Sequence, residues 1–126
     1  MKPKILLPLL ACAAIALSGC SSTPSSRYAW NNYGTHLYDY EAQQIDNAQM
    51  LEFLQQAVEE SKTRSVKLAP GLYAEIGTIL IRMGRPAEAV QYYKLEAETW
   101  PESAPFMNAL ASNVSKLTTG NKESTK

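Results

Sequence analysis

The residues able to do acid–base or metal chemistry are few, and their spacing assembles no reaction centre. His36 is the only histidine of the 126 residues, and Asp39 and Glu41 follow it closely. A metal site needs three or four ligands that converge on one point, and this spacing arranges them weakly. We therefore expect His36 to be a surface or half-buried residue, and we expect no metal and no cofactor.

Two pairs of carboxylates stand out, Glu59 with Glu60 and Glu96 with Glu98. Each pair lies close to a lysine on a predicted helix, which is typical of a solvated, salt-bridging helix face. No base stands beside a nucleophile, and there is no glycine-rich phosphate loop. We predict that the protein is not an enzyme. A reaction centre built on His36 and the carboxylates near it is the weakest alternative.

The clearest chemistry belongs to Cys20. Lys2 and Lys4 precede an apolar run of thirteen residues from Ile5 to Leu17. A membrane-spanning helix needs about 20 apolar residues, so residues 1–19 are predicted to be a signal peptide. The motif Leu17-Ser18-Gly19-Cys20 matches the bacterial lipobox. That resemblance implies cleavage before Cys20 and attachment of lipid to it; the alternative is an ordinary secreted protein with a chance cysteine.

Removal of the signal peptide changes the thiol count and the charge. Cys12 leaves, and lipidation of Cys20 consumes the second cysteine, so no disulfide and no cysteine-based metal site is expected. Loss of Lys2 and Lys4 from twelve basic residues leaves ten against twelve acidic ones. This slightly acidic balance argues against nucleic-acid binding.

The lipid anchor and the residue after it also predict where in the cell envelope the protein is located. Two or three acyl chains hold a protein firmly on a membrane, where one chain holds it only marginally. In the enterobacterial sorting rule an Asp after the lipidated cysteine retains a lipoprotein in the inner membrane. Ser21 stands at that position, so we expect the periplasmic face of the outer membrane. Residues 20–27 are expected to be the lipidated cysteine and a flexible tether.

The elements that would position any functional residue are predicted to be helices throughout residues 28–117. Between Pro70 and Pro101, apolar residues recur every three or four positions in two segments. Gly84 can end the first helix and Pro86 can begin the second. Gly77 lies on the stripe that faces the second helix and lets the two backbones approach closely.

Three more helical segments are expected, over residues 28–40, 43–61 and 103–117. Asp46 is predicted to cap the second of these, with Gln49 as its capping-box partner. Thr118 to Lys126 has no apolar residue and is expected to be a disordered tail. No alternating strand pattern is present, so the predicted fold class is all-α.

The central segment resembles a tetratricopeptide repeat. Tyr73, Ile76, Gly77 and Leu80 stand where that repeat has Trp-x-x-Leu-Gly-x-x-Tyr. Trp30, Tyr33, Gly34 and Leu37 have the same pattern 43 residues earlier. The chain departs from the repeat at Glu96, where an alanine is usual. The resemblance implies a short stack of antiparallel helix pairs, with the last helix as a C-terminal cap.

Residues 28–117 also resemble a family of small, uncharacterised proteobacterial lipoproteins. The motifs are Trp30-x-x-Tyr33-Gly34, then Pro70-Gly71-Leu72-Tyr73-Ala74-Glu75-x-Gly77, then Trp100-Pro101-Glu102-Ser103. Members of that family tend to be encoded beside a lipoprotein that resembles the curli secretion channel. The resemblance therefore implies a place in an envelope assembly, with such a lipoprotein as the partner.

The remaining candidates for function are aromatic side chains. As core, Trp30, Tyr33 and Leu37 would pack against the long helix. Aromatic residues are also enriched in binding hot spots and at membrane interfaces. The candidate partner contacts are Tyr28, Trp30, Tyr38, Tyr40 and Tyr92.

Our leading hypothesis is a lipid-anchored, non-catalytic helical module that binds another envelope protein. The alternative is a lipoprotein that binds a small molecule or a cell-wall glycan by stacking sugar rings on its tyrosines.

Overall fold

The computed structural model describes residues 26–123, with side chains for residues 26–118. The helices are α2 (Tyr33–Glu41), α3 (Asn47–Thr63), α4 (Leu72–Arg82), α5 (Pro86–Thr99) and α6 (Ala104–Glu123). Two short strands, β1 (Tyr28–Ala29) and β2 (Lys67–Leu68), and the 3-10 turn η1 (Pro101–Ser103) complete this part of the chain. The predicted all-α class is confirmed. The predicted signal peptide, Cys20, the tether as far as residue 25, and residues 124–126 lie outside the described residues.

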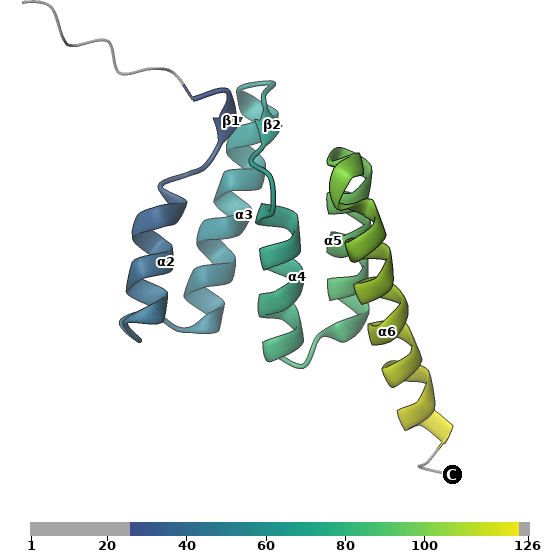
Figure 1. Ribbon diagram of the computed structural model, residues 1–126. Coiled ribbons are helices and arrows are strands. Elements are labelled where there is room, and N and C mark those ends of the chain that lie inside the picture. Colours follow the sequence, from purple (N-terminus) through teal and green to yellow (C-terminus); the bar gives the residue numbers. More distant parts are fainter. Residues whose placement is uncertain (1–25, 124–126) are drawn as a thin grey trace, which may run out of the picture.

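The helices form a row in which each one packs chiefly against its neighbours in the chain (Figure 1). Consecutive helices run in opposite directions, and the tightest packing joins α5 to α4 and to α6. The strands and the start of α4 lie near the upper end of the helices in Figure 1, where the described chain begins. The α2–α3 and α4–α5 turns lie at the opposite end.

The sequence analysis expected a helix over residues 28–40, but the helix begins only at Tyr33. Tyr28 and Ala29 instead form β1, which pairs in parallel with β2 at Lys67 and Leu68. The pairing continues where the Ala69 N–H donates to the Ala29 carbonyl at 3.1 Å. Asn31 and Asn32 then adopt left-handed backbone conformations, with φ of 43° and 53°, which turn the chain into α2. A strand of two residues has no periodicity, so the sequence pattern could not reveal it.

Three helices end in the same way. Gly84 follows α4 with φ of 73°, and hydrogen bonds run from Gly84 N–H to the Ile81 carbonyl and from Arg85 N–H to the Leu80 carbonyl. This is a Schellman motif, which confirms the predicted role of Gly84. The same pair of bonds ends α2 and α3, where the left-handed positions hold Gln43 (φ 57°) and Ser65 (φ 51°).

The helix starts agree with the sequence in two cases. Asp46 caps α3: its carboxylate accepts from the Gln49 N–H at 2.8 Å, and the Gln49 side chain accepts from the Asp46 N–H at 3.0 Å. This is the predicted capping box. Pro86 occupies the first turn of α5. Both signals are local, and they fix where α3 and α5 begin.

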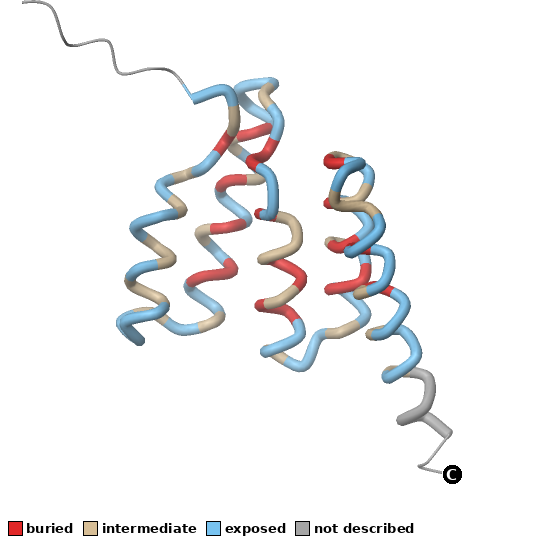
Figure 2. Tube along the Cα trace, in the orientation of Figure 1, coloured by how far each residue is buried: buried red, intermediate tan, exposed pale blue. Residues whose placement is uncertain are grey.

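The core lies along the middle of the row, where Figure 2 shows the buried residues gathered on α3, α4 and α5. Met50, Ile76 and Ala89 are fully buried there. Gly77 faces the ring of Tyr93 on α5. The predicted close approach of α4 and α5 is therefore present, with an aromatic ring as its contact.

The last helix is longer than predicted. α6 runs to Glu123, whereas the sequence analysis ended it at Leu117 and expected a tail from Thr118. The hydroxyls of Ser115 and Thr118 donate to the Ala111 and Val114 carbonyls at 2.8 and 2.9 Å, so these polar residues are accommodated within the helix. A lack of apolar residues did not end the helix here.

Candidate functional site

Two of the five candidate aromatic residues lie near the beginning of the described chain. The Tyr28 ring meets the Trp100 ring edge to face, with centroids 5.4 Å apart. Trp30 is 41% exposed and lies 6.4 Å from the Tyr33 ring. Tyr28 and Trp30 share an open hollow of about 310 Å³ with Asn31 and other polar residues. Trp30 is thus a partly covered surface residue.

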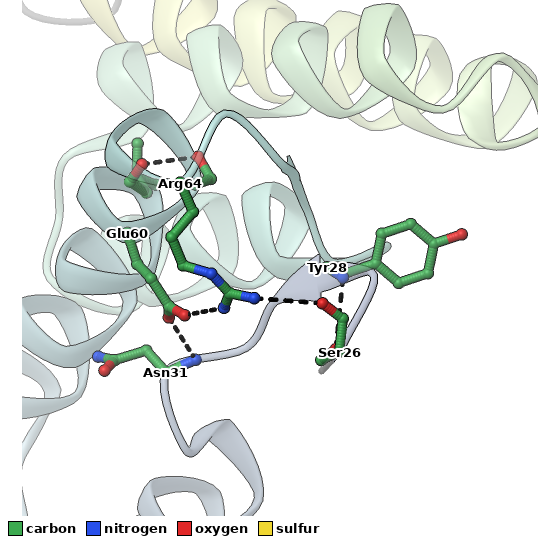
Figure 3. A network of polar contacts seen from close by, with 7 residues as sticks. Ser26, Tyr28, Asn31, Glu60 and Arg64 are labelled. Carbon is green, nitrogen blue, oxygen red and sulfur yellow. Dashed lines mark hydrogen bonds and ion pairs between the residues drawn. The ribbon is translucent and has the colours of Figure 1, made fainter. Parts of the chain in front are cut away.

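A polar network holds this hollow in shape (Figure 3). The Asn31 N–H donates to Glu60 Oε2 at 3.1 Å, and the Asn31 side-chain amide donates to the Phe53 carbonyl at 3.0 Å. Arg64 forms an ion pair with Glu60 and donates to the Ser26 carbonyl at 3.2 Å. The start of the folded part is therefore fastened to α3, and these residues act structurally.

The other candidate tyrosines are scattered over the molecule. Tyr38 is 69% exposed on α2. Tyr92 is half-buried on α5, lies 6.3 Å from the Tyr73 ring, and lines an open hollow of about 590 Å³ beside α3. Tyr40 lies at the end of α2, in a separate hollow. The five aromatics do not form one site.

Tyr40 is held by polar contacts. Its hydroxyl donates to Asn47 Oδ1 at 2.6 Å and accepts from Arg82 Nη1 at 2.6 Å. The Arg82 guanidinium carbon also lies 5.6 Å from the centre of the Tyr40 ring. The hydrogen bond that Arg82 donates to Tyr40 raises the pKa of Arg82, so the cation is stabilised there. Tyr40 thus joins α2, α3 and α4.

The acid–base candidates from the sequence behave differently from one another. The His36 ring stacks on Phe53 with centroids 3.6 Å apart, so it is half-buried, as expected. Glu59 pairs with Lys62 at 2.7 Å on an exposed face, as expected. Glu96 was expected on a solvated face, but it is 1% exposed and accepts from the Gly71 N–H at 2.7 Å. It caps the start of α4, where a carboxylate is favoured by the helix dipole.

A surface that the sequence analysis did not single out runs along α2 and α4. We call it the α2–α4 surface and define it by Tyr33, Tyr40, Glu41, Glu75 and Arg82. Burial, followed by the nearby carboxylates Glu75 and Glu41, raises the pKa of Tyr33. Burial also raises the pKa of Glu75, and Arg82 only partly opposes this effect. The Arg82–Tyr40 hydrogen bond at 2.6 Å joins α4 to α2 at one end of this surface.

Glu75 is the unusual member of this surface. It is half-buried, yet it makes no hydrogen bond or ion pair with any part of the chain that the structure describes. A partly buried carboxylate is costly unless it is paired, so Glu75 is poised to accept a donor from outside. In the sequence, Glu75 was marked only by its place between Tyr73 and Gly77 in the family motif. The apolar stripe of the helix does not include it, so the periodicity assigned it no role.

The end of the α2–α4 surface opens into a hollow beside Tyr40. This hollow measures about 630 Å³ and combines Tyr40, Glu41 and Arg82 with amide and acidic side chains of the α2–α3 turn and the start of α3: Gln43, Gln44, Asp46, Asn47 and Gln49. Such a lining offers many hydrogen-bond donors and acceptors, which suits a polar chain or ring.

Across residues 26–118, no group of three or more His, Cys, Asp or Glu side chains is placed to hold a metal ion. The α2–α4 surface itself pairs carboxylates and phenols with a guanidinium, which is a set for recognising charged and amide groups. Within residues 26–123, every helix lacks either the length or the apolar character needed to cross a bilayer.

Comparison with known proteins gives one match. The model of a family described as "Domain of unknown function (DUF4810)" matches residues 27–110. The match covers β1 through the first seven residues of the 20-residue α6, and so includes the whole α2–α4 surface. No curated protein and no solved structure matches the chain.

Proposed function

Because the chain belongs to the DUF4810 family, whose description assigns no activity, we propose a function from its own surface: a lipid-anchored helical module that binds an envelope protein. The module is held at the periplasmic face of the outer membrane and performs no catalysis. Its partner docks on the α2–α4 surface. The observation that carries this proposal is Glu75, a half-buried carboxylate without a partner in the described chain.

The anchor is Cys20, on the strength of the lipobox, and Ser21 supports the outer-membrane address. Ser26 is already tied to α3 through Arg64. Six Cα–Cα steps separate Cys20 from Ser26, which span at most about 20 Å. The folded part therefore stays close to the bilayer, and its partner must also be at the membrane surface.

The helix row supports a tetratricopeptide-like stack as the scaffold. α4 and α5 are antiparallel, Gly84 closes the turn between them, and Gly77 meets Tyr93 where the repeat has its small and aromatic residues. α2 and α3 form the preceding pair. In such stacks successive helix pairs build one extended surface that binds other proteins.

The charged groups of the α2–α4 surface indicate which chemical groups the partner must offer. Glu75 and Glu41 favour a donor such as a lysine, an arginine or an exposed backbone N–H. Arg82, which Tyr40 orients, favours a carboxylate or a carbonyl of the same segment. An extended segment of an envelope protein offers both. The lipoprotein resembling the curli secretion channel is the partner that the sequence resemblance implies.

Site-specific photocrosslinking in the envelope tests this proposal. A photoreactive residue replaces Glu41 in the full-length protein, and the matched control carries it at Gln55, an exposed residue of α3 away from this surface. We expect a discrete protein adduct from position 41 and none from position 55. Glu75→Gln should reduce the adduct at position 41. Equal adducts from both positions, or none from either, would contradict the proposal.

The hollow beside Tyr40 favours a second candidate function, the binding of a cell-wall glycan or a small polar molecule. Its volume of about 630 Å³ and its lining of amide side chains suit a sugar ring. Titration of the protein with peptidoglycan fragments, followed by the NMR signals of the Gln43 and Gln49 amides, separates the two. Saturable shifts of these amides support glycan binding, and unchanged spectra reject it.

A further inference from the structure

The outer face of α6 carries an apolar stripe that nothing in the described chain covers. Phe106 is 65% exposed and Leu117 is 75% exposed. They are eleven residues apart, which is three helical turns, so they share one face with the half-buried Leu110 between them. The buried residues Met107 and Ala111 lie on the adjoining face of α6, which packs on α5.

Comparison of α6 with α4 indicates that the stripe lacks a neighbouring helix to cover it. Met107, Leu110, Ala111 and Val114 repeat the spacing of Tyr73, Ile76, Gly77 and Leu80, 34 residues further along. In α4, neighbouring helices cover Ile76 and Leu80 completely. Their counterparts Leu110 and Val114 are only half-buried. α6 is therefore a helix of the same kind as α4 with one neighbour missing.

We propose that the missing neighbour is α6 of a second copy, packed in parallel. The stripe consists of Phe106, Leu110, Asn113 and Leu117, whose spacing of four, three and four is that of a coiled-coil seam. None of these four residues is charged, so two copies meet without repulsion. A two-fold axis along the seam places each residue opposite itself.

Asn113 decides the direction of the pair. In a parallel pair the two Asn113 amides face each other and can exchange hydrogen bonds, while apolar residues meet apolar residues. An antiparallel pair would place Asn113 against Leu110 and bury an amide without a partner. Parallel packing also points both chain starts the same way, which suits two anchors in one membrane. That last point alone rests on the proposed lipid anchor.

Disulfide trapping tests the pairing, with the full chain carrying Cys12→Ser and Cys20→Ser in mild detergent. Leu117→Cys should form a disulfide-linked dimer on mild oxidation, because position 117 lies opposite itself in the parallel pair and opposite Phe106 in the antiparallel pair that places Asn113 against Leu110. Ser112→Cys is the matched control, since Ser112 is also exposed on α6 but lies off the seam. We expect it to remain monomeric.

Sedimentation of the same protein measures the association itself. Phe106→Glu should weaken dimer formation by at least about tenfold, as expected when an apolar interface anchor is replaced. Phe106 is exposed, so circular dichroism should be unchanged. A wild-type monomer at every concentration would overturn the inference. A disulfide only between a Leu110→Cys copy and an Asn113→Cys copy, or a different protein trapped at position 117, would overturn it equally.

Discussion

The Tyr93 ring packs directly on Gly77, so that its Cε1 atom lies 2.7 Å from the position that a Cβ at residue 77 would take. This contact sets the separation of α4 and α5, the pair at the centre of the core. Because both helices are well packed, an added side chain must displace the ring or the backbone.

Gly77→Ala should therefore destabilise the protein by about 1–3 kcal/mol, and Gly77→Leu by more. Urea denaturation measures this difference. The control is Gly34→Ala in α2, where a Cβ meets nothing within 4 Å. There the substitution should stabilise by about 0.5–1 kcal/mol, because alanine favours a helix over glycine. Equal effects at the two positions would contradict the close-packing argument.

Substitution by glycine at the ends of α2 and α3 should stabilise the protein. Gln43 and Ser65 occupy left-handed positions that suit glycine. Gln43→Gly and Ser65→Gly should each raise the free energy of unfolding by up to about 1 kcal/mol. Gln44→Gly is the control, because Gln44 does not have a positive φ, and it should bring no gain. Loss of stability in both glycine variants would reject the strain that we assign to these positions.

Glu75 should limit stability at neutral pH. Burial raises its pKa above the ordinary value of 4.5, so the folded protein binds a proton more readily than the unfolded chain. Its charge therefore destabilises the fold above the raised pKa, and the penalty diminishes as the pH falls from that pKa to 4.5 and is absent below 4.5. Glu75→Gln should melt higher than wild type at pH 7 and at the same temperature below pH 4.

The same variant links stability to function. If the α2–α4 surface binds a partner, Glu75→Gln should lose binding while gaining stability, so loss of binding cannot be attributed to unfolding. Glu88→Gln is the control of opposite sign, because the hydrogen bond from Arg85 lowers the pKa of Glu88. It should melt no higher than wild type at pH 7. A Glu75→Gln protein that melts lower at pH 7 would refute the assignment.

Glu96 should be required for the start of α4. Glu96→Ala removes the acceptor for the Gly71 N–H and leaves a space in the core, so we expect a loss of about 2 kcal/mol or more. Glu96→Gln keeps an acceptor oxygen and should cost less. Glu98→Ala, on the exposed side of the same helix, should have little effect on thermal melting. Similar melting temperatures for Glu96→Ala and wild type would show that this cap is dispensable.

Cys20 should carry the anchor. Cys20→Ser should abolish labelling by radioactive palmitate and release the protein from the membrane fraction. Cys12→Ser, within the predicted signal peptide, should change neither. Palmitate on the Cys20→Ser protein would overturn the lipoprotein assignment.

Local signals in the sequence predicted the helices well. Asp46 with Gln49, Gly84, and Pro86 each mark a helix end through contacts within a few residues, and each was found where expected. Gln43 and Ser65 were missed because neither residue type marks a left-handed position. The β1–β2 pairing was missed because it joins positions 39 residues apart, Tyr28 and Lys67.

The candidate site was less predictable, because it depends on contacts between helices. Tyr40 lay off the predicted core stripe, yet Arg82 fixes it from 42 residues away. Glu96 was predicted to be solvated because it follows Lys94, and the structure buries it against Gly71. The role of Glu75 could not be predicted, because its partial burial and its lack of a hydrogen bond in the described chain depend on how α2 and α4 pack.

The parallel pairing of β1 with β2 has a mechanical consequence for a tethered protein. If Cys20 anchors the chain as we propose, tension enters at Ser26 and meets the Arg64–Ser26 hydrogen bond at 3.2 Å and the Ala29–Ala69 hydrogen bond at 3.1 Å before it reaches α2. β2 passes that load to Leu72 and α4, in the centre of the core. Because Arg64 also ties Ser26 to the end of α3, the load is shared between α3 and α4, and α2 is not the first helix to be loaded from the attached end.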